Sequence, residues 1–393
     1  TVVRGSILAL GVGIILFSVL YFFNFKNRLA KKALTIVILM LLLFIIFSFA
    51  LKDSNLVKNS GFLSRVTDFS LDSFTVKTRF WAWQAGLRGW AESAKTMLIG
   101  WGPENFNIPF SKYFYPRFFR GIGSESLFDR AHNMFVEVLV TMGILSLIAY
   151  ISIFISAYWK SWKARLSLES PDKAVSIGLI SLLTAYIIHN SFIFDTSPNY
   201  IAFFIVLGFI NFLSLPETAR AAASSEPQSP RTKPSGILSA ALAIMLLISL
   251  YAIYKINILP IKANYGVTRG IVASWNGDFS GAVNKFKKAL NYDVAGKYDF
   301  RHRFAQLVID KTGAGELDET KIAAIKYAIE EVKKNEAEVK QDYLPYLYIS
   351  RLYIILGKKD PKSPYNDIAL ENSMKALEIS NKFVRTYYEV AQA

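Results

Sequence analysis

The chain contains no cysteine among its 393 residues. This absence excludes disulfide bonds, thiolate nucleophiles and cysteine metal sites. The sequence also lacks a G-x-x-x-x-G-K-[ST] phosphate loop, a G-x-S-x-G elbow and a His/carboxylate cluster with metal-ligand spacing. An ATPase and a metal-dependent transferase that uses nucleotide sugars are therefore disfavoured, and we expect no metal ion and no cofactor.

Acidic residues are also scarce, since 30 Asp and Glu stand against 45 Lys and Arg and leave a formal net charge of +15. A basic chain can bind nucleic acid, but basic residues also flank membrane helices and meet anionic lipid head groups. The second explanation is favoured because 52% of the residues are hydrophobic and many of them are clustered in long runs. We expect membrane lipids as partners, and no nucleic acid.

Six apolar runs approach the roughly 20 residues that cross a bilayer core. Apart from Glu137 in the third run, Asp, Glu, Lys and Arg do not interrupt them. The runs are residues 7–23, 33–51, 134–158, 174–194, 200–215 and 237–254. The sequence therefore predicts an all-α, polytopic helical membrane protein with about six membrane helices. Because the chain begins at Thr1 without a signal-peptide pattern, we interpret it as a fragment that lacks upstream membrane helices.

The orientation follows from the basic residues, which favour short cytoplasmic connections. They concentrate in the connections after the first, third and fifth runs. Placing these three inside puts the long loop 52–131, the turn 195–199 and the C-terminal tail outside. We therefore expect a multi-pass protein of the cytoplasmic (inner) membrane, with the long loop and the tail on its outer face.

Composition divides the chain into four parts. Residues 1–215 form the membrane block, which includes the outside loop 52–131. Residues 216–236 are rich in Ala, Ser and Pro, and this composition is typical of a flexible linker, here cytoplasmic. Residues 237–258 are the sixth membrane helix, and residues 259–393 are a polar, helix-periodic tail.

The tail resembles a tetratricopeptide repeat. Gly270 and Ala282 are the small residues where paired helices touch, Phe286 follows at the expected offset, and a second match begins at Leu356-Gly357. The usual Pro near the end of the repeat is missing. The resemblance implies a small solenoid of stacked helix pairs that contacts a protein or glycan partner. A generic array of helical hairpins is the alternative.

The chain has three histidines, and two of them are candidates for acid–base chemistry. His132 lies where the long loop re-enters the membrane, and His189 lies near the outer end of the fourth run. An ionisable residue at membrane depth is a functional candidate, and His can act as a base near neutral pH. Interface hydrogen bonding is the alternative for both. His302, between Arg301 and Arg303, is expected at the surface of the tail.

The aromatic and basic side chains of loop 52–131 allow two interpretations. Aromatic rings can rest at the membrane interface or stack on sugars. Arginine can bind phosphate through two parallel hydrogen bonds, or it can snorkel and make cation–π contacts. Composition does not choose between these roles.

Four motifs in this region resemble the O-antigen ligase and polymerase superfamily. They are Arg79-x-x-x-Trp83, the turn Gly100-Trp-Gly-Pro-x-Asn-Phe106, the pair His132-Asn133, and Gly143-Ile-Leu145, and they occur in the family's order. The close resemblance spans roughly residues 77–147, and the tail lies outside it. The family often has Glu two residues before the last glycine, where this chain has Thr141.

The resemblance implies a metal-independent glycosyltransferase of lipopolysaccharide or other cell-envelope polysaccharide biosynthesis. Such an enzyme moves a glycan from a polyprenyl-pyrophosphate donor to a hydroxyl of a glycan, lipid or protein acceptor. By resemblance, His132 is the base that activates the hydroxyl and Arg79 holds the pyrophosphate. The further candidate substrate-binding residues are Trp83, Arg88, Trp101, Asn105, Arg117, Arg120 and Asn133.

Two alternatives belong to other classes. A non-catalytic membrane scaffold would use its tail to recruit partners, and the order of the four loop motifs opposes it. A transporter would carry charges or broken segments at the midplane of its helices, and Glu137 is almost the sole candidate.

Overall fold

The computed structural model describes residues 4–61, 63–67, 74–120, 127–167, 170–224 and 236–393. These residues contain α-helices, one 3-10 turn and one π-helical turn, and no strand. The chain divides into two compact units, Thr1–Tyr113 with Arg120–Gln228 and Phe114–Phe119 with Ser229–Ala393. The all-α fold predicted from the sequence is therefore confirmed.

All six apolar runs form helices, because a backbone without water must satisfy its hydrogen bonds within the segment. The helices are α1 (Arg4–Asn24), α2 (Arg28–Ala50), α8 (Met134–Ser167), α9 (Ser170–Asn190), α10 (Ser197–Leu213) and α12 (Gly236–Ile253). Five described helices are long and apolar enough to cross a membrane, and α10, with 17 residues, is a shorter apolar helix. The chain is thus a multi-pass membrane protein.

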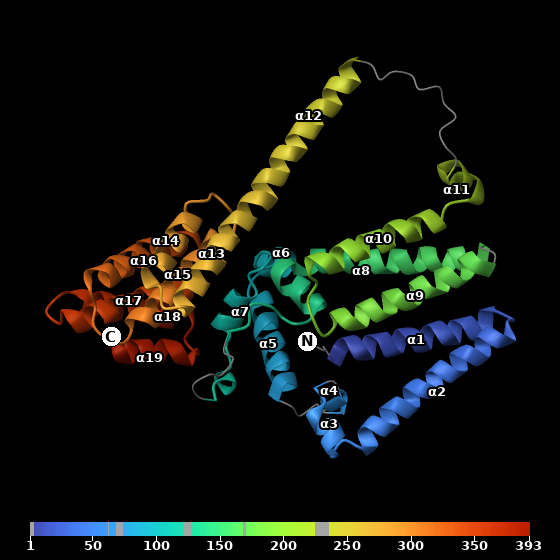
Figure 1. Cartoon of the computed structure of the whole chain (residues 1–393), viewed down its shortest axis with the longest axis horizontal. Helices are drawn as coiled ribbons and strands as arrows, with labels where there is room; N and C mark the ends of the chain where they lie inside the picture. Colours follow the sequence, from blue (N-terminus) through green and yellow to red (C-terminus); the bar gives the residue numbers. More distant parts are fainter. Residues whose placement is uncertain (1–3, 62, 68–73, 121–126, 168–169, 225–235) are drawn as a thin grey trace. The chain divides into compact units, whose positions relative to one another are not determined.

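Helices α1, α8, α9 and α10 of the first unit lie side by side (Figure 1). Small and hydroxyl-bearing residues allow the close approach, as in other membrane helix pairs. A Cβ on Gly13 would lie 3.0 Å from the Ala185 methyl group, so α1 and α9 nearly touch there. Between α8 and α9, Tyr158 and Thr184 share a hydrogen bond of 2.6 Å.

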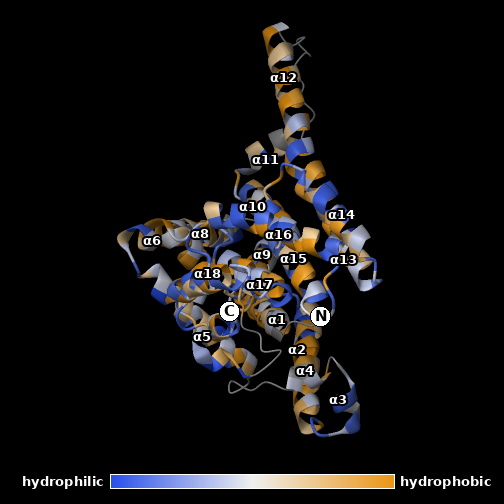
Figure 2. Ribbon diagram, turned by 90° about the vertical axis from the view of Figure 1, so that its left-hand side faces the viewer, coloured by the Kyte–Doolittle hydropathy of each residue, from blue (hydrophilic) through white to orange (hydrophobic). Residues whose placement is uncertain are grey.

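Two apolar helices bury almost nothing within the described part of the protein. Ser48 is the sole buried residue of α2, and α12 has none. Figure 2 shows α12 coloured as hydrophobic along most of its length. Such surfaces require lipid around them, and this agrees with membrane insertion.

The segment between α2 and α8 consists of short helices. They are α3 (Asn55–Asn59), α4 (Leu63–Thr67), α5 (Phe74–Trp90), α6 (Ala94–Ile99) and α7 (Asn107–Lys112), and Pro116–Phe118 forms the 3-10 turn. The buried face of α5 consists of small residues, Thr78, Ala82, Ala85, Gly86 and Gly89. Residues 62, 68–73 and 121–126 of the predicted loop 52–131 lie outside the described residues.

The predicted linker, residues 216–236, differs from expectation in its first part. Helix α11 (Glu217–Ser224) forms there, because alanine has the highest helix propensity. Arg220 of α11 donates to Asp172 Oδ2 in α9 at 2.8 Å. Residues 225–235 of the linker lie outside the described residues.

The second unit contains the tail helices. They are α13 (Leu259–Trp275), α14 (Phe279–Leu290), α15 (Lys297–Thr312), α16 (Glu319–Glu338), α17 (Leu344–Lys359), α18 (Tyr365–Ile379) and α19 (Val384–Gln392). The π-helical turn Tyr254–Ile258 joins α12 to α13 in one continuous helix. A Cβ on Gly270 would lie 2.7 Å from the Phe286 ring, so α13 and α14 touch at the predicted small residue.

The expected surface position of His302 is wrong, because its side of α15 faces the tail core. The residue is only 9% exposed, and its ring lies 4.8 Å from that of Tyr298 and 5.3 Å from that of Tyr348. Arg301 is buried as well, with ion pairs of 3.4 Å to Glu331 and 2.6 Å to Glu338. Arg301, the charged neighbour of His302, therefore belongs to a buried ion pair and does not indicate a solvent-exposed helix face. Burial lowers the pKa of His302 from 6.5 to about 4.

The tail should lose stability on acidification. Between pH 6.5 and pH 4 the unfolded chain protonates His302 and the folded tail does not. The free energy of unfolding therefore falls as the pH drops through this window, by on the order of 3 kcal/mol from this group. Urea unfolding of residues 259–393, followed by circular dichroism, measures the effect. The stability difference between wild type and His302→Gln should change between pH 7.5 and pH 5, and a constant difference contradicts the assignment.

Candidate functional site

Helix α8 interrupts its own backbone at Gly143, where φ is 81° and ψ is 178°. A break of this kind leaves carbonyl groups of the preceding turn without helical donors. The Val140 carbonyl accepts the N–H of Trp101 at 3.1 Å instead. The Thr141 carbonyl accepts the N–H of Gly102 at 2.7 Å. We call this contact between residues 98–102 and 140–143 the backbone joint.

Glycine is required at two points of the backbone joint. A Cβ on Gly143 would overlap the Leu98 carbonyl, and a Cβ on Gly100 would overlap the Thr141 carbonyl. Both glycines also have positive φ, 81° and 71°, which other residues rarely adopt. The Gly-Trp-Gly-Pro motif and the Gly-Ile-Leu motif are therefore two sides of one contact.

Two predicted substrate-binding side chains connect the backbone joint to its surroundings. The indole N–H of Trp101 donates to the carbonyl of Gly89 in α5 at 3.0 Å. The amide N–H of Asn105 donates to the Trp101 carbonyl at 3.1 Å. Both polar groups thus have backbone partners within the fold.

Ala131 precedes His132, and both its backbone N–H and its carbonyl bond side chains. The N–H of Ala131 donates to Glu137 Oε2 at 2.6 Å, and its carbonyl accepts the indole N–H of Trp83 at 2.6 Å. Glu137 is 5% exposed and Ala131 is fully buried, so water does not compete for either bond. This arrangement fixes the start of the turn to α8 on one side and to α5 on the other.

The residue after His132 is fixed as well. Asn133 precedes α8, and its Oδ1 accepts the N–H groups of Phe135 and Val136 at 3.0 and 3.2 Å. This is the geometry of an N-cap, which satisfies donors that a helix start leaves unpaired. The predicted substrate-binding Asn133 therefore uses its carbonyl oxygen to cap the helix.

His132 lies in this turn with a left-handed backbone, φ 53°. Such a conformation costs a non-glycine residue about 1 kcal/mol and persists where neighbours hold it. Its Nδ1 lies 3.2 Å from the Arg130 carbonyl oxygen. Because a carbonyl can only accept, Nδ1 is the donor, and in the neutral ring Nε2 then carries the lone pair. This is the tautomer that a general base at Nε2 requires.

The ring of His132 is half-buried between two phenylalanines. Its centroid lies 5.7 Å from that of Phe128 and 5.4 Å from that of Phe194, both edge to face. The guanidinium of Arg130 lies 4.8 Å from the Phe194 ring and pairs with Glu104. Two phenylalanine rings therefore flank the imidazole, and the ion pair of Arg130 and Glu104 lies beside the Phe194 ring.

Arg79, on α5, reaches the turn that also touches His132. Its Nη1 donates to the Phe192 carbonyl at 3.1 Å, and Phe194 contacts the His132 ring. Since two residues of chain span at most about 7 Å, both candidate residues meet the short turn between α9 and α10. The structure thus brings both to one turn of the first unit.

The other predicted arginines do not share this turn in any described contact. Arg88 is exposed in the last turn of α5. The guanidinium of Arg120 lies 3.8 Å from the Phe74 ring, which is the cation–π arrangement. Arg117 is exposed and belongs to the second unit.

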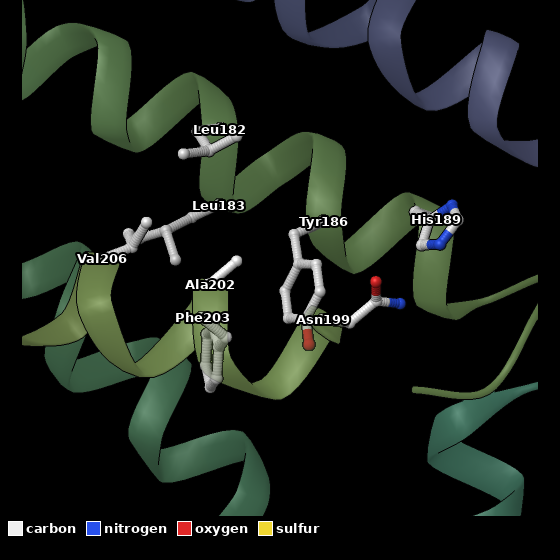
Figure 3. Close-up of a pocket in the computed structure, with 8 residues that line it drawn as sticks. All are labelled: Leu182, Leu183, Tyr186, His189, Asn199, Ala202, Phe203 and Val206. Atoms are coloured by element: carbon white, nitrogen blue, oxygen red, sulfur yellow. The ribbon is translucent and has the colours of Figure 1, made fainter. Parts of the chain in front are cut away.

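A largely apolar pocket of about 170 Å³ lies between α9 and α10 (Figure 3). It is lined by Leu182, Leu183, Tyr186, His189, Asn199, Ala202, Phe203 and Val206. Figure 3 shows His189 and Asn199 toward one end and Leu182 and Val206 toward the other. His189 Nδ1 lies 3.0 Å from Ser6 Oγ in α1, so this histidine has a helix-linking partner.

Asp195 is 6% exposed beside this pocket and belongs to no motif identified in the sequence. Its carboxylate accepts from Tyr186 at 2.6 Å and from Asn190 at 3.0 Å, and burial raises its pKa. The feature of the sequence that could indicate this residue is a single acidic side chain between two apolar runs. Among the described residues, no group of three or more His, Cys, Asp or Glu is placed to hold a metal ion.

Comparison with known families agrees with the motifs that form the backbone joint and the His132 turn. Residues 1–151 match the family model for O-antigen ligase. This match supports the O-antigen ligase superfamily and a membrane enzyme of ligase or polymerase type, and the tail lies outside the matched residues. Neither curated proteins nor solved structures gave a match.

Alanine at Gly143 should disrupt the backbone joint of the first unit. The added Cβ overlaps the Leu98 carbonyl at a positive φ, so we expect a loss of about 2–4 kcal/mol in stability. Thermal unfolding in detergent, followed by tryptophan fluorescence, should show a lower midpoint for Gly143→Ala.

Gly208→Ala in α10 is the matched control, because no heavy atom lies within 4 Å of its Cβ position. Its midpoint should equal that of the wild type or exceed it slightly, since alanine favours helix. Equal midpoints for the two variants would show that Gly143 is not a constrained position.

Proposed function

We propose that the protein is a glycosyltransferase of ligase or polymerase type that uses a lipid-linked donor. It would transfer a glycan from a polyprenyl-pyrophosphate to a hydroxyl group of a glycan, lipid or protein acceptor. The observation that supports this most directly is the held turn of His132, in which Nδ1 faces the Arg130 carbonyl, so that in the neutral ring Nε2 carries the lone pair. Such preorganisation matches the needs of a general base.

His132 would begin the reaction. Its Nε2 removes the proton of the acceptor hydroxyl while that oxygen attacks the anomeric carbon of the donor sugar. The new glycosidic bond forms as the bond between sugar and pyrophosphate breaks. The protonated imidazole keeps its Nδ1–H bond to the Arg130 carbonyl, so the ring does not need to turn during the transfer.

Arg79 would stabilise the leaving group. The pyrophosphate gains negative charge as its bond to the sugar breaks, and a guanidinium held nearby stabilises charge that develops in the transition state. The bond from Arg79 to the Phe192 carbonyl fixes the side chain at the turn that also meets His132. Arg88, Arg117 and Arg120 would add positive charge that attracts the anionic donor.

The active face would be the outer side of the cytoplasmic membrane. Basic residues in the connections after α1, α8 and α10 favour the inside for these three segments. The segment 52–131 and the tail would then lie outside, where lipid-linked glycans are presented. The tail, which pairs helices at small residues as a tetratricopeptide repeat does, would contact an acceptor or a protein partner.

Replacement of the base should abolish transfer. Membranes that carry His132→Ala should transfer glycan at less than about one hundredth of the wild-type rate, because general bases contribute on the order of 10²–10⁴. His189→Ala is the matched control and should retain most activity, since His189 bonds Ser6 in α1. The assay uses a polyprenyl-pyrophosphate glycan with candidate acceptors. Wild-type rates in both variants would refute the assignment of His132 as the general base. A wild-type protein without transfer activity would favour a non-catalytic scaffold.

Loss of the Arg79 charge should weaken use of the donor. Arg79→Ala should lower kcat/KM for the lipid-linked donor at least about tenfold, and Arg79→Lys should recover part of it through charge alone. The same transfer assay at varied donor concentration measures both. Unchanged donor kinetics in Arg79→Ala would exclude the pyrophosphate role.

A further inference from the structure

Six residues of the long loop belong to the same compact unit as the tail. They are Phe114–Phe119, grouped with Ser229–Ala393. Phe114 is 1% exposed and Phe118 is fully buried, although both lie in a short irregular segment with one 3-10 turn. A segment of this length cannot bury two phenylalanines within itself, so other side chains must cover them.

Aromatic residues of the tail cover Phe114, and Phe118 packs on Phe114 with ring centroids 5.3 Å apart. The Phe114 ring packs edge to face on Phe383, with centroids 4.9 Å apart, and Phe383 packs at 4.9 Å on Tyr343. Phe119 lies 6.0 Å from Tyr388. Edge-to-face and tilted pairs at these distances are the favourable arrangements of aromatic rings.

The tail holds its own side of this cluster in place. Tyr343 and Phe383 stand directly before α17 and α19, and both are 2% exposed. Arg351 of α17 pairs with the buried carboxylate of Glu389 in α19. This ion pair fixes α19 against α17 and so presents Phe383 and Tyr388 to the loop segment.

We propose that the end of the tail formed by α17–α19 is a docking site for the loop segment Phe114–Phe119 of the same chain, and that the tail thereby fixes the conformation of this segment. The occupant is in place in the structure, and its two phenylalanines are buried there. The loop segment is thus held at both its aromatic ends, by Phe383 and by Tyr388.

The functional consequence rests on the proposed glycan transfer. Arg117 projects from the docked segment as an exposed residue between Pro116 and the buried Phe118. Docking would hold this cation in one place, where it could guide an anionic donor. The tail would then hold the segment Phe114–Phe119 in place, in addition to any contact with a separate partner.

Limited trypsin digestion tests the docking without a transfer assay. Cleavage after Arg117 requires the buried Phe118 to move away from Phe114, whose ring centroid lies 5.3 Å from its own, so cleavage should be slow in the full chain. Phe383→Ala and Phe114→Ala should each accelerate it on the order of tenfold, because each removes one ring of the same pair. Phe114→Ala changes only the loop side, so misfolding of the tail cannot explain its effect. Unchanged cleavage in Phe114→Ala would overturn the proposal.

The absence of cysteine from the chain allows a second, independent test. A pair of cysteines at Phe119 and Tyr388 should be joined by a short thiol cross-linker, because these rings lie 6.0 Å apart. Tyr387 is the matched control: it is 54% exposed against 53% for Tyr388, and its hydroxyl donates to the Asn381 carbonyl instead. A protease site inserted between residues 225 and 235 separates the two fragments on a gel unless they are joined.

The Phe119→Cys/Tyr388→Cys pair should cross-link several-fold faster than the Phe119→Cys/Tyr387→Cys pair. Equal rates for the two pairs would overturn the docking. Neither digestion nor cross-linking involves glycan transfer, so a docked segment in an inactive protein would count against the proposed function alone. If transfer is active, Phe114→Ala should lower its rate about threefold to tenfold at low donor concentration, and an unchanged rate would overturn the positioning role.

Discussion

Two backbone hydrogen bonds join the N–H groups of Trp101 and Gly102 to carbonyls in the interrupted turn of α8. They fix the position of α8 against the segment that follows α6. They exist because Gly143 breaks the helical hydrogen-bond pattern and frees two carbonyls. Gly100 and Gly143 allow the backbones to meet without a side chain between them. A broken helix at membrane depth is tolerated where protein supplies the missing partners. Here the partners come from the segment that also carries the candidate site.

The conformation of the His132 turn depends on the same packing of α8 against the loop segment. Glu137, on α8 before the break, holds the Ala131 N–H, and Trp83, on α5, holds its carbonyl. Because the backbone joint sets how α8 meets the α5–α6 segment, it also determines whether both anchors can reach Ala131 together. Several residues that the sequence predicts to bind substrate instead bond backbone groups, and these bonds hold the His132 imidazole in place.

The six apolar runs predicted the five described helices that are long and apolar enough to cross a membrane, and the shorter apolar helix α10, since length and hydrophobicity decide insertion. The order of the four motifs predicted which loop residues matter, but not that the glycine motifs touch, because no spacing in the sequence encodes a contact between a turn and a helix break. The role of Trp101 could not be predicted for the same reason, because its partner Gly89 lies on another helix. Asn105 and Asn133 bond groups within four residues of themselves, and an Asn directly before an apolar run is itself a signal for an N-cap. His302 was misplaced because Arg301 is buried with Glu331 and Glu338, and charge in a sequence is normally a sign of solvent.

The backbone joint can be measured directly by amide hydrogen exchange on the membrane-embedded protein. Trp101 and Gly102 follow a short helix in what the sequence marks as a loop, and loop amides ordinarily exchange fast. If their N–H groups bond the Val140 and Thr141 carbonyls, they should exchange as slowly as amides inside α8. Exchange as fast as that of the exposed connection between α1 and α2 would contradict the joint, and with it the account of how His132 is held.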